Sequence, residues 1–149
     1  MTRALNKLAW PVAVVYWALL ATASLLPSGT GPLKGWDAAI APDLQDALHL
    51  PAYAGLVILL SLAWSVRHRV TARSVAIIAL VCAVFGTAME LAQLVIPGRT
   101  CALGDGLVNI AGAVLGSLAV LLGRRFSDSW WPAPTDRTAA EGHTKQSSG

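Results

Sequence analysis

The sequence predicts an all-α, polytopic membrane protein, a bundle of four transmembrane helices. Of its 149 residues 55% are hydrophobic and 13% are charged, and the mean hydropathy is +0.58. Soluble domains carry charges at about a quarter of their positions. A helix of about 20 residues spans the roughly 30 Å hydrocarbon core of a bilayer, so four such helices use nearly the whole chain. This leaves no room for a separate soluble enzyme domain.

Four apolar segments carry this prediction, and they cover residues 8–26, 47–66, 74–96 and 107–123. The first and third end at Pro27 and Pro97, which are typical helix-stop residues. The second and fourth end at arginines, and the fourth is short for a span. Strands of a membrane barrel would be about half as long and would alternate polar with apolar residues. Helices are therefore expected throughout.

The basic residues predict how the bundle is oriented. Nine of the eleven lysines and arginines fall on the side of the N-terminus, and two fall on the other side. Because cytoplasmic loops collect basic residues, both termini are expected in the cytoplasm, with residues 28–45 and 98–105 outside. The nine are Arg3, Lys7, Arg67, Arg69, Arg73, Arg124, Arg125, Arg137 and Lys145, and the two are Lys34 and Arg99.

The chain divides into a transmembrane domain, residues 1–125, and a polar tail, residues 126–149. The tail has little that could form a core, and we expect it to be disordered in the cytoplasm. A cleaved signal peptide is the alternative for the N-terminus, because Arg3 and Lys7 precede an apolar run that ends in small residues. That run is longer than the usual 7 to 15 residues of a signal sequence, so an uncleaved first helix is preferred.

Several classes of function are not favoured by the sequence. The net charge of +3 comes from basic residues that flank apolar runs, not from one patch, so no nucleic acid is expected. Cys82 falls within a span and Cys101 in an outer loop, too far apart in depth for a disulfide. The spacing of cysteine and histidine fits no zinc site. We expect no metal and no cofactor.

Polar residues in or beside three spans predict a cluster in the outer half of the membrane. Two of them, His49 and Tyr53, are four apart and share a helix face. Ionisable residues within a membrane usually face the bundle interior or a cavity, so these side chains are expected to converge. The predicted ligand-binding residues are His49, Tyr53, Glu90, Gln93, Arg99, Asp105 and Asn109.

Glu90 needs a partner in this cluster, because an unpaired carboxylate in the bilayer is unfavourable. It lies six residues before the end of its segment, which is about 9 Å at 1.5 Å per residue. Arg99 follows in a loop rich in turn residues and could fold back toward Glu90 or Asp105. Asp105 has a second interpretation, as the N-cap of the fourth helix.

Gly112 and Gly116 form a G-x-x-x-G pair on the fourth segment. Such a pair lets two helix backbones approach closely. We expect it to pack inside the four-helix unit, and a homo-oligomer formed through the same two glycines is the alternative.

These motifs together resemble the VanZ-like family of small bacterial membrane proteins. The stretch from Glu90 through Gln93 to Gly112 is the most specific part, and the resemblance covers roughly residues 8–123. One departure lies before His49, where members usually carry Asp-Lys-x-x-His and this chain has Gln45 and Asp46. The matching residues are Ser24 to Pro27, His49 with Tyr53, Glu90 with Gln93, Pro97 to Arg99, and Asp105 with Asn109 and Gly112.

The resemblance implies a multi-pass protein of the bacterial cell membrane, in a family whose founding member is associated with resistance to the glycopeptide teicoplanin. Three functions fit the cluster. It could bind a membrane lipid, a lipid-linked envelope precursor or a glycopeptide, which is the preferred hypothesis. It could be purely structural and fix the helix register. It could also be an enzyme in which His49 is a general base and Glu90 or Asp105 assists, but no known catalytic motif supports this.

Overall fold

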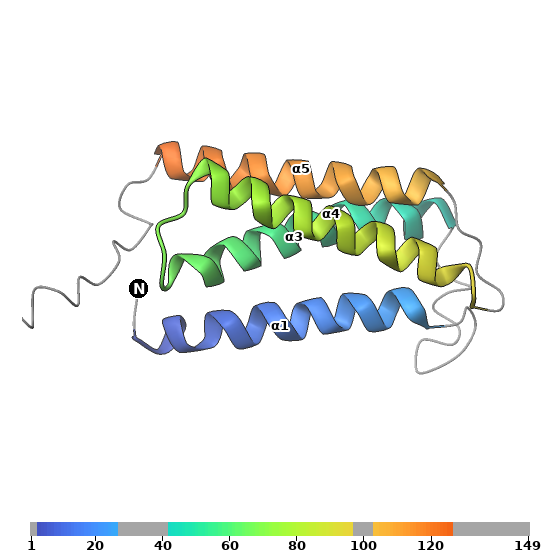
Figure 1. Cartoon of the computed structure of the whole chain (residues 1–149), viewed down its shortest axis with the longest axis horizontal. Coiled ribbons are helices and arrows are strands. Elements are labelled where there is room, and N and C mark those ends of the chain that lie inside the picture. The colour runs from blue at the N-terminus through green and yellow to red at the C-terminus, as the bar shows by residue number, and fades with distance from the viewer. Residues whose placement is uncertain (1–2, 27–41, 97–102, 127–149) are drawn as a thin grey trace, which may run out of the picture.

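The computed structural model describes the backbone of residues 3–26, 42–96 and 103–126. This part of the chain forms four helices: α1 (Arg3–Leu25), α3 (Pro42–Ser65), α4 (Ala72–Gln93) and α5 (Leu103–Phe126). Each contains a stretch long and apolar enough to cross a membrane. Successive helices run in opposite directions along one common axis (Figure 1). The predicted four-helix, all-α fold is therefore confirmed.

The up-and-down order defines two ends of the bundle. The start of α1, the end of α3, the start of α4 and the end of α5 meet at one end, which we call the basic end because it carries Arg67, Arg69, Arg73, Arg124 and Arg125. The opposite end is called the His49 end. Both ends of the described chain lie at the basic end (Figure 1). Which end faces the cytoplasm stays a prediction, and most of the tail, residues 127–149, lies outside the described residues.

The helices differ from the predicted segments mainly at their ends. The fourth segment was expected to be short, yet α5 has 24 residues. It gains its first turn because Gly104, Asp105 and Gly106 continue the helix instead of ending the loop. Hydropathy marks only the apolar part of a helix, so its polar first turn is not detected.

Local sequence explains the start of α4. Thr71 and Ser74 form a capping box, in which Thr71 Oγ1 accepts from the Ser74 backbone at 3.1 Å and Ser74 Oγ accepts from the Thr71 backbone at 2.8 Å. Each hydroxyl satisfies an amide that the helix leaves without a partner. The capping box therefore fixes the start of α4, which runs antiparallel to α3 (Figure 1).

Helix α5 packs along α3 through a stripe of small and buried residues. A Cβ added at Gly112 would collide with the backbone carbonyl of Leu50, and one added at Gly116 would lie 2.5 Å from Ala54 O. Only glycine allows this close backbone approach. The G-x-x-x-G face therefore packs against α3 inside the bundle, and the predicted homo-oligomer through Gly112 and Gly116 stays untested.

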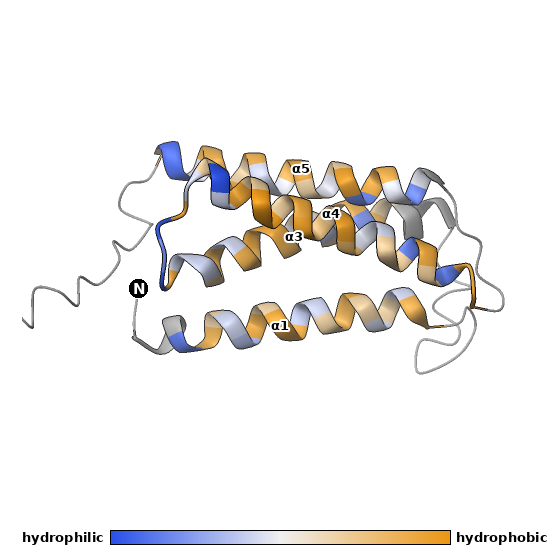
Figure 2. Cartoon of the chain, viewed as in Figure 1, coloured by the Kyte–Doolittle hydropathy of each residue, from blue (hydrophilic) through white to orange (hydrophobic). Residues whose placement is uncertain are grey.

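Large apolar side chains cover the outside of the bundle. Leu19 and Leu80 are 62% and 64% exposed, and Leu107 is 68% exposed. Orange and pale positions dominate each helix in Figure 2, while blue positions also occur within α4 and α5 toward the right of the view. Such an exterior fits lipid, so the chain is a multi-pass membrane protein with polar groups inside one half.

Candidate ligand-binding site

Three helices each contribute one polar side chain to a connected cluster near the His49 end. Asn109 of α5 is fully buried, Glu90 of α4 is 5% exposed, and the His49 side chain of α3 is 26% exposed. His49 Nδ1 lies 3.0 Å from Asn109 Oδ1, and Asn109 Nδ2 donates to Glu90 Oε1 at 3.3 Å. His49 Nδ1 is also 4.0 Å from Glu90 Oε1. The predicted convergence of these three residues is confirmed.

The antiparallel fold explains why residues far apart in sequence meet here. His49 lies near the start of α3, Asn109 in the second turn of α5, and Glu90 in the last turn of α4. Those three positions have similar depth in an up-and-down bundle, because α3 and α5 begin at the end where α4 finishes. The three residues therefore lie at a similar depth because successive helices are antiparallel.

The hydrogen bonds show which imidazole nitrogen donates to Asn109. Since the Asn109 amide nitrogen faces the Glu90 carboxyl group, the Asn109 oxygen must face His49 and accept from Nδ1–H. A neutral imidazole protonated at Nδ1 carries a lone pair on Nε2. Nε2 makes no hydrogen bond within the described part of the chain. In the neutral ring, the cluster thus presents one oriented acceptor on its partly exposed residue.

A glycine makes this geometry possible. Gly86 lies one turn before Glu90 on α4, and a Cβ added there would be 2.9 Å from both Asn109 Cβ and Tyr53 Cε1. A side chain at Gly86 would therefore displace Asn109, Tyr53 or both from their places in the cluster. Sequence reasoning missed this residue, although its place four residues before Glu90 puts it on the same face.

Tyr53 belongs to the cluster through its ring. It is 2% exposed and stacks on His49, with ring centroids 6.5 Å apart and an interplanar angle of 22°. On its other side it contacts Phe85 at 6.2 Å, and Phe85 contacts Trp17 edge-on at 5.4 Å. Tyr53 thus packs against the imidazole, and Phe85 and Trp17 continue this series of ring contacts to α1.

Gln93, which the sequence assigns to the predicted cluster, connects α4 to α1. Its Nε2 donates to the backbone carbonyl of Ser24 on α1 at 3.1 Å. The side chain is 3% exposed. Gln93 therefore attaches the first helix to the polar half.

Of two further predicted site residues, the structure describes Asp105 but not Arg99. Asp105 is partly buried in the first turn of α5. The helix begins at Leu103, so Asp105 does not occupy the N-cap position, although its charge still suits a helix N-terminus. Arg99, and with it the predicted pair between Arg99 and Glu90, lies outside the described residues. Within the described part of the chain, no group of three or more His, Cys, Asp or Glu could hold a metal ion.

The fold and this cluster define a class: small four-helix membrane proteins with a buried polar network near one end of the bundle. The chain belongs to the VanZ/LLP1 family, since the sequence model of that family matches residues 12–124. The matched range contains the whole His49, Glu90 and Asn109 cluster. No match was found among curated proteins or among solved structures.

Proposed function

We propose that this protein binds the polar headgroup of an envelope lipid, a lipid-linked envelope precursor or a glycopeptide at the His49 cluster. In the bacterial cell membrane this binding would support the envelope or contribute to teicoplanin-type resistance. One observation carries the proposal: His49 is partly exposed and held at Nδ1 by Asn109, while its Nε2 makes no hydrogen bond within the described chain.

The chemistry of that atom suits such a ligand. A bare Nε2 accepts a hydrogen bond from a hydroxyl or amide group, and sugars and peptides of envelope precursors offer both. The Asn109 and Glu90 chain fixes the ring, so little rotational freedom is lost when a ligand binds. We assign Tyr53, Gln93 and Asp105 to the same site, and Arg99, which lies outside the described residues, remains a predicted partner of the headgroup.

An intramembrane enzyme is the second candidate, favoured by the same oriented imidazole. A histidine held at Nδ1 by a polar partner is the arrangement of a general base. This function would need a substrate hydroxyl or water next to Nε2. Turnover of a lipid-linked substrate would separate it from binding, because a binding protein releases its ligand unchanged.

Conservative variants separate binding from a purely structural role. Glu90→Gln keeps an acceptor for Asn109 but removes the charge, and His49→Gln removes the ring. We expect both to lose lipid binding or teicoplanin resistance while protein abundance stays normal. The matched control is His68→Gln, because His68 is exposed at the basic end. Full activity of the Glu90 and His49 variants at normal abundance would support the structural role instead.

The predicted orientation is tested by cysteine labelling in intact cells. Cys101 belongs to the predicted outer loop and should react with a membrane-impermeant maleimide. Cys82 is fully buried in the bundle and serves as the unreactive internal control. Labelling of Cys101 only after the cells are permeabilised would place the His49 end in the cytoplasm and exclude an outward-facing site.

A further inference from the structure

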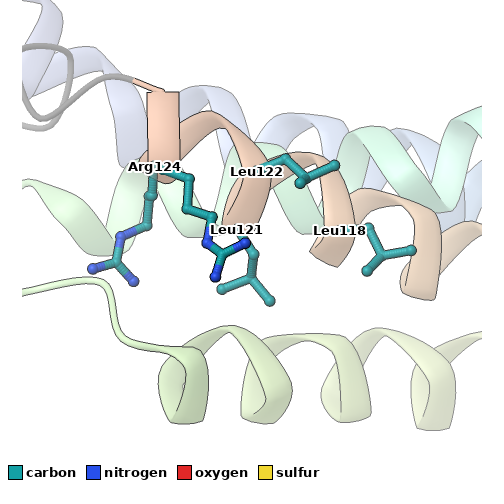
Figure 3. Close-up of a pocket in the computed structure, with 5 residues that line it drawn as sticks. Leu118, Leu121, Leu122 and Arg124 are labelled. Carbon is teal, nitrogen blue, oxygen red and sulfur yellow. The ribbon is translucent and has the colours of Figure 1, made fainter.

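A concave surface lies at the basic end, far from the His49 cluster. It is a groove of about 550 Å³ along the last turns of α5 (Figure 3). Figure 3 shows Leu118, Leu121 and Leu122 along the helix, with Arg124 beyond them at its end. The described residues that line it are Leu118, Leu121, Leu122, Arg124 and Arg125.

The groove has an apolar floor. Leu118 and Leu122 are 49% and 51% exposed, so much of their surface is available for contact. Leu121 is partly buried and packs against the cluster of Val70, Val75 and Val120, which joins α4 to α5. The floor is therefore anchored in the packed bundle, and an acyl chain would fit along it.

The mouth of the groove is strongly basic. Arg124 Nε is buried and has no hydrogen-bond partner among the described residues, although buried donors are usually satisfied. Arg125 beside it is exposed. The C-terminal end of a helix repels an anion, so an anion here must be attracted by the arginines. The described charged side chains at this end are all basic, and the others are Lys7, Arg67, Arg69 and Arg73.

The two parts of the groove lie at the depths that a lipid requires. From Gly104 to Arg124 the helix rises about 30 Å at 1.5 Å per residue, which matches the hydrocarbon core of a bilayer. When α5 spans the membrane, the arginines stand at headgroup level and the leucines lie among acyl chains. Basic pockets at this depth suit acidic headgroups.

We propose that this groove binds one anionic phospholipid. The phosphate contacts Arg124 and Arg125, whose guanidinium groups match a phosphate in two-point geometry. An acyl chain lies along Leu118 and Leu122. This is a defined site, distinct from the diffuse attraction that any basic membrane surface exerts on acidic lipids.

Native mass spectrometry of the full chain in mild detergent tests the proposal. The probes are phosphatidylglycerol, phosphatidylcholine and inorganic phosphate. The wild type should retain one phosphatidylglycerol in preference to phosphatidylcholine. Arg124→Gln and Arg125→Gln should each weaken this binding about tenfold, as expected for the loss of a charged hydrogen bond. Arg73→Gln, an exposed basic residue at the same end and outside the groove, should change it less than about twofold.

Several outcomes would overturn the site. An equal loss in Arg73→Gln would mean diffuse attraction, and equal retention of phosphatidylcholine would mean that the headgroup charge is not recognised. Displacement of the lipid by millimolar inorganic phosphate would identify a site for a free anion. Should Arg124→Gln fail to fold, Arg125→Gln decides the question, since that side chain is exposed and its loss leaves the bundle intact.

Discussion

The two halves of the bundle satisfy their polar side chains in different ways. In the half toward the His49 end, side chains bond across helices: His49 with Asn109, Asn109 with Glu90, and Gln93 with the Ser24 carbonyl. In the basic half, the described hydroxyls that form a hydrogen bond do so within their own helix or its cap, as Ser65 does to the Leu62 carbonyl at 2.6 Å, while the buried Ser61 Oγ has no partner among the described residues. Among the described residues, hydrogen bonds between side chains of different helices occur only in the His49 half.

Packing differs in the same way. Gly112 brings the α5 backbone against α3 in the His49 half, and Gly86 leaves room beside α4 for the Asn109 and Tyr53 side chains. In the basic half the contact is made by valines, with Val120 packed against Val70 and Val75. Short polar side chains reach each other only where backbones approach closely. The small residues are therefore a condition for the polar cluster, although Gly116 extends the close contact with α3 past the middle of the bundle.

The largest expected effect comes from breaking this close approach. Gly112→Ala places a methyl group against the Leu50 carbonyl, and backbone cannot yield as a flexible side chain can. Overpacking of this kind costs about 3 kcal/mol, so the free energy of unfolding should fall by a large fraction of its usual value. The measurement is the unfolding midpoint in an SDS titration of mixed micelles.

Gly123→Ala is the matched control for Gly112→Ala. It lies on the same helix, and an added Cβ there meets nothing within 4 Å. Alanine favours a helix by up to about 1 kcal/mol over glycine, so this variant should be neutral or slightly more stable. Equal destabilisation by the two alanines would contradict the difference between the halves.

Composition and helical spacing predict much of this molecule. Hydropathy alone gives the four helices, and the depths of His49, Glu90 and Asn109 predict their meeting, because antiparallel spans align residues of equal depth. The role of Gly86 and the bond from Gln93 to α1 could not be predicted in this way. They depend on how far each helix is rotated about its axis and how closely backbones pack, and both follow from tertiary contacts.

Asn109→Ala should have the second largest effect. It removes both cross-helix hydrogen bonds of the cluster and leaves the buried Glu90 Oε1 without this donor. Bonds between membrane helices average about 0.6 kcal/mol each, so we expect a loss of about 1 to 2 kcal/mol. Ser117→Ala is the control, because Ser117 Oγ bonds only the Ala113 carbonyl of its own helix at 2.8 Å. Similar losses of folding free energy in both variants would show that a hydrogen bond between helices stabilises the fold no more than one within a helix.

Gln93→Leu should cost less, about 1 kcal/mol for one hydrogen bond. Its expected consequence is local, because the bond to Ser24 attaches α1 and does not touch the His49 network. Hydrogen exchange should therefore rise in the last turns of α1 and stay unchanged in α5. Thr87→Ala, which loses only an own-helix bond to the Ala83 carbonyl, provides the comparison. Increased exchange in α5 would place Gln93 within the central network.

The smallest expected effect concerns the middle of the bundle, where α1 meets α3. Tyr16 Oη donates to the Ala52 carbonyl at 3.0 Å, so Tyr16→Phe removes one hydrogen bond and keeps the ring, at a cost of about 0.6 kcal/mol. A Cβ added at Gly55 would also lie 3.0 Å from Tyr16 Oη. Gly55→Ala should thus be less harmful in the Tyr16→Phe background than in the wild type. A double-mutant cycle in SDS measures this coupling, and strictly additive effects would show that the hydroxyl does not set the distance between α1 and α3.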